Sequence, residues 1–388
     1  MPLSMFAITA PGLESLAAAE LRAIGATQVR AEEGGVGFTG GREMLYAANL
    51  WLRTASRVLV RVAAFHASEF HELERRARRV PWDQYAVPDR AIRFRVTCRK
   101  SRLYHSDAVA QRFAAAVAVT LGDGAIAGTA ASSGTDDQED DGGDAQLFIV
   151  RIAHDECTVS ADSSGVLLHQ RGYRQAVARA PLRETLAAAM LLAAKWNPAA
   201  PLVDPMCGSG TIGIEAALLA RRLAPGRKRT FAFQRWPDAD ERAWTALLSR
   251  AEGGVVAGAI APIVCADRDA GAVAATRANA ERAGVADDID VREGAISSIE
   301  ARGESGWLVT NPPYGVRVGE RDKLRSLYAQ LGHVARRVFP GWTIALLAAD
   351  RALASQLQLS LEPKMATSNG GIPVELLVGR VPVREAAQ

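Results

Sequence analysis

The chain has 388 residues, of which 48% are hydrophobic and 23% charged, and its formal net charge is +3. This length exceeds one typical core, so two or three domains are expected. No apolar stretch reaches the roughly 18–20 residues of a membrane span, the N-terminus lacks the basic-then-apolar order of a secretory signal, and the four scattered cysteines form no Cys-x-x-Cys pair. We therefore expect a soluble, cytoplasmic protein, with a monomer as the default. The six histidines have no metal-ligand spacing, so no metal site is expected.

The small net charge hides an uneven distribution. Residues 136–144 hold six acids and no base, so basic side chains are in excess elsewhere in the chain. Such an excess suits a polyanionic partner. The alternative is an arginine-rich composition that has no binding role.

The N-terminal part predicts an α+β arrangement with one irregular stretch. Hydrophobic periodicity and turn residues indicate strands at 6–9, 29–38, 57–64 and 91–98, helices at 11–24, 45–52 and 106–121, and a hairpin of 147–153 with 157–161. Residues 122–145 are rich in Gly, Ala, Ser and Asp and have no periodicity. They indicate a flexible surface insertion.

From about residue 181 the pattern changes to alternating strands and helices. The sequence predicts helices at 181–195, 211–222, 269–283 and 322–338, strands at 202–203, 263–266, 307–310 and 342–348, and a final antiparallel hairpin around 369–372. Alternation of this kind is typical of a doubly wound, mostly parallel sheet. Ligands of such sheets bind at the carboxyl ends of the strands, where Asp204, Asp267 and Asn311 are expected to converge.

A glycine-rich loop follows the first of these strands, reading Asp204-Pro205-Met206-Cys207-Gly208-Ser209-Gly210-Thr211. Gly208 to Gly213 satisfies the Gly-x-Gly-x-x-Gly dinucleotide pattern, but the acid expected about 20 residues later is missing. Asp204 would repel a pyrophosphate, whereas it suits the cationic part of S-adenosylmethionine, and Asp267 would accept bonds from ribose hydroxyls. A methyl donor is therefore favoured over a dinucleotide or a structural turn. Cys207 has no partner His or Lys, which indicates a buried small side chain.

The sequence Asn311-Pro312-Pro313-Tyr314-Gly315 carries the second motif. The side-chain oxygen of Asn311 and the carbonyl of Pro312 can accept the two N–H groups of an exocyclic amine, and Tyr314 can stack on a base taken out of its helix. Prolines have a fixed φ and no N–H, so Pro312 and Pro313 make a stiff acceptor loop. A plain turn is the alternative for this motif on its own.

Together these motifs resemble the bacterial THUMP-domain class I RNA guanine-N2 methyltransferases, which act on 23S rRNA or tRNA. The resemblance covers nearly the whole chain, with the family's first and fourth motifs at 204–211 and 311–315, its donor-covering helix at 180–187, an inserted segment at 224–236, and the THUMP signature and exit at 99–106 and 169–174. It implies a ferredoxin-like part at 1–65, a THUMP RNA-binding domain at 66–165 and a Rossmann-like class I methyltransferase domain at 175–388, whose doubly wound sheet has an antiparallel last strand.

The resemblance also implies a cofactor, S-adenosyl-L-methionine, a partner, structured RNA, and the residues that contact them. Catalysis is implied for Asn311, Pro312, Pro313 and Tyr314. The cofactor contacts implied are Glu184, Thr185, Asp204, Met206, Gly208, Gly210, Thr211, Asp267, Arg268, Ala295 and Ile296. The RNA contacts expected are Arg93, Arg95, Arg99, Lys100, Arg102 and His105, with a solvated charged edge as the alternative.

Two departures from the family pattern and three rival functions stay open at this point. Ala295 stands where the family has an acid that contacts the adenine amine, and the acidic insertion lies inside the expected THUMP region. About 73 residues follow Gly315, and the sheet needs them, so substrate recognition is expected from the N-terminal half. The large-subunit rRNA is the expected substrate. The rivals are a tRNA guanine-N2 methyltransferase, an N6-adenine methylase and an RNA-binding protein without activity.

Overall fold

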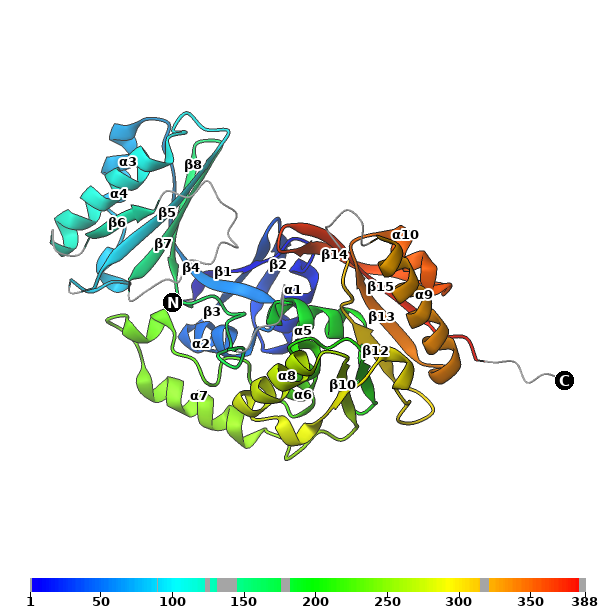
Figure 1. The fold of residues 1–388 in the computed structure, drawn as a ribbon. Helices are drawn as coiled ribbons and strands as arrows, with labels where there is room; N and C mark the ends of the chain where they lie inside the picture. Colours follow the sequence, from blue (N-terminus) through cyan, green and yellow to red (C-terminus); the bar gives the residue numbers. More distant parts are fainter. Residues whose placement is uncertain are drawn as a thin grey trace. The chain divides into compact units, whose positions relative to one another are not determined.

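The computed structural model describes residues 2–88, 90–122, 126–130, 145–175, 182–314 and 321–383. The chain forms two compact units (Figure 1). The first holds Met1–Ala10, Ala17–Leu168 and Arg229–Ser249, and the second holds Pro11–Leu16, His169–Lys228 and Arg250–Gln388.

The first unit is built on one mixed sheet in the order β2-β3-β1-β4-β8-β7-β5-β6. Its strands are β1 Leu3–Thr9, β2 Thr27–Glu32, β3 Gly35–Gly40, β4 Ala55–His66, β5 Ile92–Arg99, β6 Ile126–Ala130, β7 Gln146–Ala153 and β8 Glu156–Asp162. Neighbours are antiparallel except β5, which runs parallel to β6 and β7. The long strand β4 pairs with β1 on one side and β8 on the other. The sheet therefore continues through the boundary predicted at residue 65.

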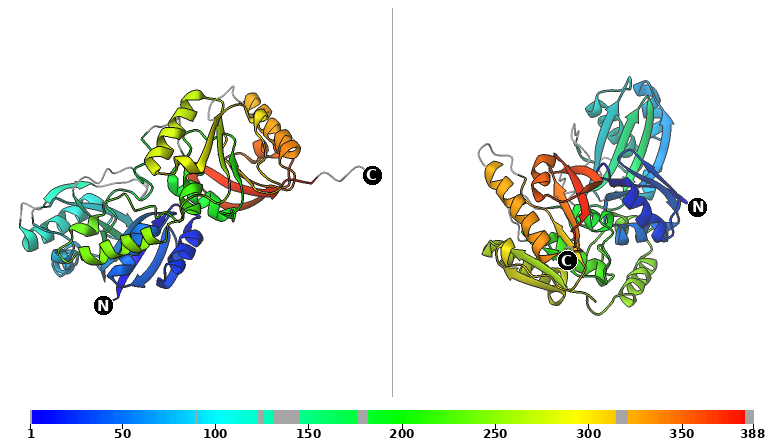
Figure 2. Two further views of the ribbon diagram at one scale, coloured as in Figure 1. Left: turned by 90° about the horizontal axis from the view of Figure 1, so that it is seen from below. Right: turned by 90° about the vertical axis from the view of Figure 1, so that its right-hand side faces the viewer.

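Helices of the N-terminal half pack on this sheet around an aromatic core. They are α1 Glu14–Ala23, α2 Arg42–Trp51, α3 Phe70–Ala77, the 3-10 turn η1 Trp82–Gln84 and α4 Ser106–Leu121. Figures 1 and 2 show α3 and α4 together on one face of β5 and β7. Beneath them the buried Trp82 ring lies edge-on to Phe94, Phe113 and Phe148, with centroids 5.0 Å apart for Trp82 and Phe148, a favourable geometry for aromatic pairs.

Residues 229–249 interrupt the second unit in sequence but pack on the first. They contain η3 Ala232–Arg235 and most of α7 Glu241–Gly253. Phe233 stacks on Tyr46 with centroids 4.5 Å apart, and the Trp236 indole donates to Gln146 Oε1 at 2.9 Å. The predicted range 175–388 thus includes a stretch that completes the core of the first unit.

The acidic insertion is partly ordered, contrary to the sequence prediction. Residues 122–145 were expected to lack regular structure, which is wrong for Ile126–Ala130, since this segment pairs with β5 as strand β6. Residues 123–125 and 131–144 lie outside the described residues, as do Ala180, Pro181 and Gly315.

The second unit has a seven-stranded sheet in the order β11-β10-β9-β12-β13-β15-β14. Its strands are β9 Leu202–Asp204, β10 Ile263–Asp267, β11 Ile289–Glu293, β12 Trp307–Thr310, β13 Thr343–Ala348, β14 Glu362–Asn369 and β15 Ile372–Arg380. Adjacent strands are parallel except β15, which is antiparallel to β13 and β14. This confirms the predicted doubly wound sheet and its final hairpin.

Helices cover both faces of this sheet. They are α5 Glu184–Ala193, α6 Thr211–Ala220, α8 Ala270–Ala283, α9 Arg321–Val338 and α10 Arg351–Ala354, with 3-10 turns η4 Ala286–Asp288, η5 Ile296–Ser298 and η6 Ser355–Leu357. Figure 2 shows α6 and α8 on one face and α9 and α10 on the other. The helix α8 is capped by Asp269, as predicted, whose carboxylate accepts from the Gly271 amide at 2.8 Å.

The strand order places a topological switch point between β9 and β12. From β9 the chain continues through β10 to β11 on one side, and from β12 through β13 on the other. A crevice at the carboxyl ends of the strands is the usual ligand site of such sheets. Among the described residues, every helix is too short or too polar to cross a membrane.

Candidate active site

The glycine loop after β9 has the backbone conformations that its sequence suggests. Gly208 and Gly210 have φ values of 56° and 81°, a region that side chains other than glycine rarely adopt. A Cβ on Gly210 would lie 2.5 Å from the Thr276 side chain, so α8 requires glycine there. A Cβ on Gly208 would meet nothing within 4 Å, so a ligand can approach its backbone.

Helix α8 holds this loop in place. The Thr276 hydroxyl donates to the Gly208 carbonyl at 2.8 Å, and the Asn279 amide donates to the Ser209 carbonyl at 3.0 Å. Both side chains are fully buried. Cys207 lies 3.6 Å from the Thr276 hydroxyl and is 7% exposed, which supports the packing role expected for its thiol.

Asp204 is the last residue of β9, and the pKa of its carboxyl group is raised. Its side chain is 1% exposed and accepts from the Met206 amide at 3.2 Å. Burial raises the pKa of Asp204 to about 7; the Met206 amide and the Thr310 hydroxyl oppose the rise, and the negative charge of Asp267 adds to it. A cation bound nearby would favour the ionised form of this group.

Asp267 joins the end of β10 to the glycine loop. Its Oδ2 accepts from the Gly208 amide and its Oδ1 from the Asp269 amide, each at 3.0 Å. The carboxylate is half-buried, whereas the neighbouring Arg268 is exposed. Three strand ends therefore meet, because β9 pairs in parallel with β10 on one side and with β12 on the other.

The loop after β12 contains a buried acceptor without a partner. Asn311 and Tyr314 are half-buried, Pro312 is buried and Pro313 is exposed. The Tyr314 hydroxyl oxygen accepts a hydrogen bond from the side-chain amide of Asn369 at 2.5 Å. The Tyr328 hydroxyl donates to the Pro313 carbonyl at 3.5 Å. Asn311 Oδ1 has no hydrogen-bond partner within the part of the chain that the structure describes. Such an orphaned acceptor costs about 1–3 kcal/mol, which a bound N–H donor would recover.

Helix α5 begins with a second buried carboxyl group. Glu184 is 1% exposed, its Oε1 lies 3.4 Å from Arg174 Nε, and its Oε2 has no partner among the described residues. Burial raises the pKa of Glu184 to about 7, although the charge of Arg174 opposes the rise. Thr185, the next residue, is 8% exposed. Glu184 and Asp204 are thus two carboxyl groups that a cationic ligand would ionise.

The turn after β11 lies beside the end of β10. The Gly294 amide donates to the Asp267 carbonyl at 2.9 Å. Ala295 is exposed and Ile296 is buried. The Ala295 carbonyl already accepts from the Ser298 hydroxyl at 2.8 Å. Ala295 therefore supplies no side-chain acceptor, and its carbonyl is occupied.

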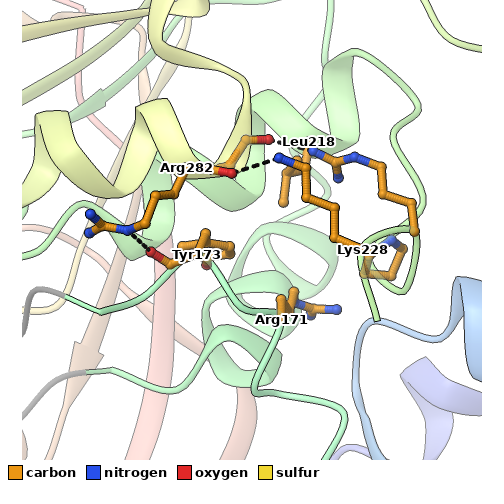
Figure 3. A pocket seen from close by; sticks show the side chains of 8 residues that line it. Arg171, Tyr173, Leu218, Lys228 and Arg282 are labelled. Atoms are coloured by element: carbon orange, nitrogen blue, oxygen red, sulfur yellow. Dashed lines mark hydrogen bonds between the residues drawn. The ribbon is translucent and has the colours of Figure 1, made fainter. Parts of the chain in front are cut away.

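Charged side chains hold the segment that enters the second unit, beside the pocket drawn in Figure 3. Arg171 Nε lies 2.9 Å from Glu215 Oε1, and the Tyr173 hydroxyl donates to the same oxygen at 3.0 Å. Arg282 donates to the Tyr173 carbonyl at 2.8 Å, and Lys228 to the Arg282 carbonyl at 2.7 Å. Cations at the last carbonyls of α8 complement its dipole. The pocket between them has room for about one water molecule, which indicates a structural role for its residues.

The expected RNA contacts lie in the first unit and differ in exposure. Arg99, Lys100, Arg102 and His105 are exposed along the segment after β5. Arg99 forms a loose pair with Glu33 at 3.9 Å, and the Arg102 amide donates to Asp155 at 2.7 Å.

The two arginines within β5 are less accessible. Arg93 is half-buried and Arg95 is 5% exposed. Phosphate contact by Arg95 would require its side chain to leave the interior, so we exclude Arg95 from the RNA surface.

Sequence reasoning missed several residues of the site. Thr276, Asn279, Arg174 and Asn369 contact the predicted residues through tertiary hydrogen bonds or an ion pair. Thr310 opposes the rise in the pKa of Asp204. For two of them, the place in the sequence could have indicated a role. Thr310 directly precedes Asn311, and Arg174 lies in the segment that resembles the THUMP exit. Among the described residues, no group of three or more His, Cys, Asp or Glu side chains is arranged to hold a metal ion.

Known proteins resemble this chain over its whole length. Residues 171–376 match the RMKL-like methyltransferase domain, and residues 4–59 match the RlmL ferredoxin-like domain. A Synechocystis protein, provisionally named an RNA methyltransferase, is 37% identical and covers 96% of this chain and 95% of its own length. A ribosomal RNA large subunit methyltransferase K/L from Syntrophotalea carbinolica is also 37% identical and covers 97% of this chain. The chain spans about half, 53%, of that relative's length.

Solved structures share the complete fold. A provisionally named methyltransferase solved with S-adenosylhomocysteine has a TM-score of 0.85 and 27% identity, covering 100% of this chain and 99% of its own. A predicted N6-adenine-specific DNA methylase from Listeria monocytogenes has a TM-score of 0.82 and 29% identity over 97% of this chain and 96% of its own.

These likenesses decide between the ligands that the glycine loop allowed. S-adenosylhomocysteine is what S-adenosyl-L-methionine becomes after it gives up its methyl group, so the cofactor is S-adenosyl-L-methionine and not a dinucleotide. The residues present fit it, since a buried carboxyl group and an open glycine backbone lie at the end of β9, and a second buried carboxyl group begins α5. With an N-terminal ferredoxin-like domain and a class I methyltransferase fold, the chain belongs to the RMKL-like methyltransferase family.

Proposed function

We propose that this protein transfers a methyl group from S-adenosyl-L-methionine to the exocyclic N2 amine of a guanine in structured RNA, with large-subunit rRNA as the substrate. The observation that carries the proposal is the buried, unpartnered Oδ1 of Asn311 at the end of β12. Relatives named ribosomal RNA large subunit methyltransferase K/L support the choice of RNA. A cytoplasmic location and a monomeric state are part of the same proposal.

Asn311 and Pro312 would hold the amine that accepts the methyl group. The lone pair of this amine is delocalised into the purine ring, so the free amine is a poor nucleophile. Two carbonyl oxygens that accept its N–H groups fix the amine and return electron density to nitrogen. Tyr314 would stack on the extruded base, an interaction worth about 1–3 kcal/mol.

The carboxyl groups would bind the donor. Asp204 and Glu184 are buried with their pKa values raised to about 7, so they suit the cationic amino-acid end, and Asp267 would accept from the ribose hydroxyls. During the reaction the N–CH₃ bond forms as the S–CH₃ bond breaks, and the amine proton leaves to solvent. The residues contribute chiefly by alignment, which can supply large effective molarities.

The RNA would be positioned by the first unit, whose residues 66–165 we propose to be a THUMP domain. Arg99, Lys100, Arg102 and His105 are exposed together on one segment, with Arg93 half-buried on the adjoining strand. Contacts of such side chains with phosphates fix the register of the substrate without reading its sequence.

There are three rival functions. Two of them are methyl transfers at the same site, and the third is RNA binding without catalysis. The loop also fits the N6 amine of adenine, the target in the name of the Listeria methylase, and a tRNA could replace rRNA. A silent RNA-binding protein is the third rival, since Ala295 offers no acid to the donor's adenine.

The test is tritiated-methyl transfer to rRNA from a strain that lacks the enzyme, with donor binding measured by calorimetry. Wild type should label the RNA, Asn311→Ala should bind the donor normally but transfer slowly, and Asp267→Ala should bind the donor weakly. A wild-type protein that binds donor and RNA but transfers nothing would establish the silent alternative.

A further inference from the structure

The hydroxyl of Tyr314 is held by amide groups from two separate segments. The Asn369 amide donates to it at 2.5 Å, and the Asn311 amide forms a second hydrogen bond with it. Burial raises the pKa of Tyr314, and both amide bonds oppose that rise. The Asn369 nitrogen is the donor in the first bond. In the second bond it is the Asn311 nitrogen that faces the phenolic oxygen, because the side-chain oxygen of Asn311 has no hydrogen-bond partner among the described residues.

This arrangement fixes which atom of Asn311 remains for a ligand. A side-chain amide is planar, so a nitrogen directed at Tyr314 leaves the oxygen on the other side. That oxygen is buried and has no partner among the residues that the structure describes. Reversing the amide would present N–H donors instead, which suit a carbonyl oxygen and not an amine.

Asn369 reaches the loop from a hairpin with a defined register. It is the last residue of β14 and pairs with Ile372 across a turn formed by Gly370 and Gly371, whose φ values are 58° and 82°. Both glycines adopt a conformation that few other residues tolerate. The turn therefore sets the place of the Asn369 side chain independently of the loop after β12.

We infer that Asn369 is a positioning residue that, through the Tyr314 hydroxyl, keeps the Asn311 amide with its oxygen toward the amine to be methylated. The inference rests on the proposed function of Asn311. It assigns the β14–β15 hairpin a part in selecting an amine over a carbonyl oxygen at the target atom.

Fluorine NMR of the full chain labelled with 3-fluorotyrosine tests the contact directly. The Tyr314 resonance is the one that disappears in Tyr314→Phe. Asn369→Ala should shift this resonance, whereas Ser368→Ala, a change one residue earlier in the same strand, should not. An unshifted Tyr314 resonance in Asn369→Ala would overturn the inference, whether or not the protein methylates guanine.

Single-turnover methyl transfer then tests the consequence. Asn369→Ala should lower the rate roughly 3- to 10-fold, the effect of one neutral hydrogen bond, with unchanged affinity for S-adenosylhomocysteine. In the Tyr314→Phe background the same change should have no further effect. Equal effects of Asn369→Ala in both backgrounds, or a matching loss in Ser368→Ala, would show that Asn369 does not act through the hydroxyl.

Discussion

Replacing Asp204 by asparagine should have opposite effects on stability and on donor binding. The pKa of Asp204 rises from 3.8 to about 7 in the folded protein because of burial. A raised pKa means that the carboxyl group contributes stability below pH 4, which is lost as the pH rises toward 7. The side-chain amide introduced by Asp204→Asn would keep an acceptor for the Met206 backbone amide but would never ionise.

The size of the effect follows from the pKa shift. Each pKa unit corresponds to about 1.4 kcal/mol, so ionised Asp204 destabilises the fold by up to about 4 kcal/mol at pH 8. Between pH 5.5 and pH 8, the stability advantage of Asp204→Asn over wild type should grow by about 2 kcal/mol. Glu184 titrates in both proteins, so its contribution cancels in this comparison.

The assay is denaturant unfolding of both ligand-free proteins at the two pH values, together with calorimetric titration of S-adenosylhomocysteine. Asp204→Asn should bind the ligand roughly 10- to 100-fold more weakly, since a charged hydrogen bond is worth about 1.5–3 kcal/mol. If the stability difference does not change with pH, the carboxylate is solvated or paired in solution, and the reasoning from burial is wrong.

Four further outcomes follow from the same site. Donor affinity should increase between pH 6 and pH 8, because Asp204 and Glu184 must ionise to bind a cation. Calorimetry in buffers of different ionisation enthalpy should register the release of protons on binding. A donor affinity that does not change with pH would contradict this prediction. Arg174→Ala should raise the pKa of Glu184 further by removing the opposing charge, so its donor-binding defect should be larger at pH 7 than at pH 9. Asn311→Ala should lower the single-turnover rate about 100- to 1000-fold with normal donor affinity, and a matching loss of affinity would indicate a damaged cofactor loop instead. Lys100→Ala with Arg102→Ala should weaken RNA binding for all sequences and reduce its salt dependence by about two ion equivalents, with Arg95→Ala as the buried comparison.

The convergence of the strand ends was predictable from the sequence because it follows from topology. Parallel strands of a doubly wound sheet end at one edge, so Asp204, Asp267 and Asn311 could be placed together once their strands were recognised. The structure joins Asp267 to the glycine loop through Gly208. The fine geometry was not predictable, since Asn369 is distant in sequence and is brought to Tyr314 only by the hairpin's pairing.

The errors have physical causes as well. The strand β11 is short and has two apolar residues, Ile289 and Val291, which is a weak signal. The helix α7 does carry apolar residues at helical spacing, Trp244, Leu247, Leu248 and Ala251, and its omission was an error in reading the sequence. Alternation in β5 shows that Arg93 and Arg95 share a face, but it does not show whether that face is covered. Burial of Arg95 is decided by tertiary packing, which one strand's sequence does not specify.

Nucleoside mass spectrometry of the methylated RNA tests the central claim most directly. The purified chain would be incubated with isotopically labelled donor and total RNA from a strain lacking the enzyme, and the fractions digested separately. The label should appear as N2-methylguanosine in the large-subunit rRNA. Label in N6-methyladenosine would contradict the assignment of the amine, and label confined to tRNA would contradict the assignment of the substrate.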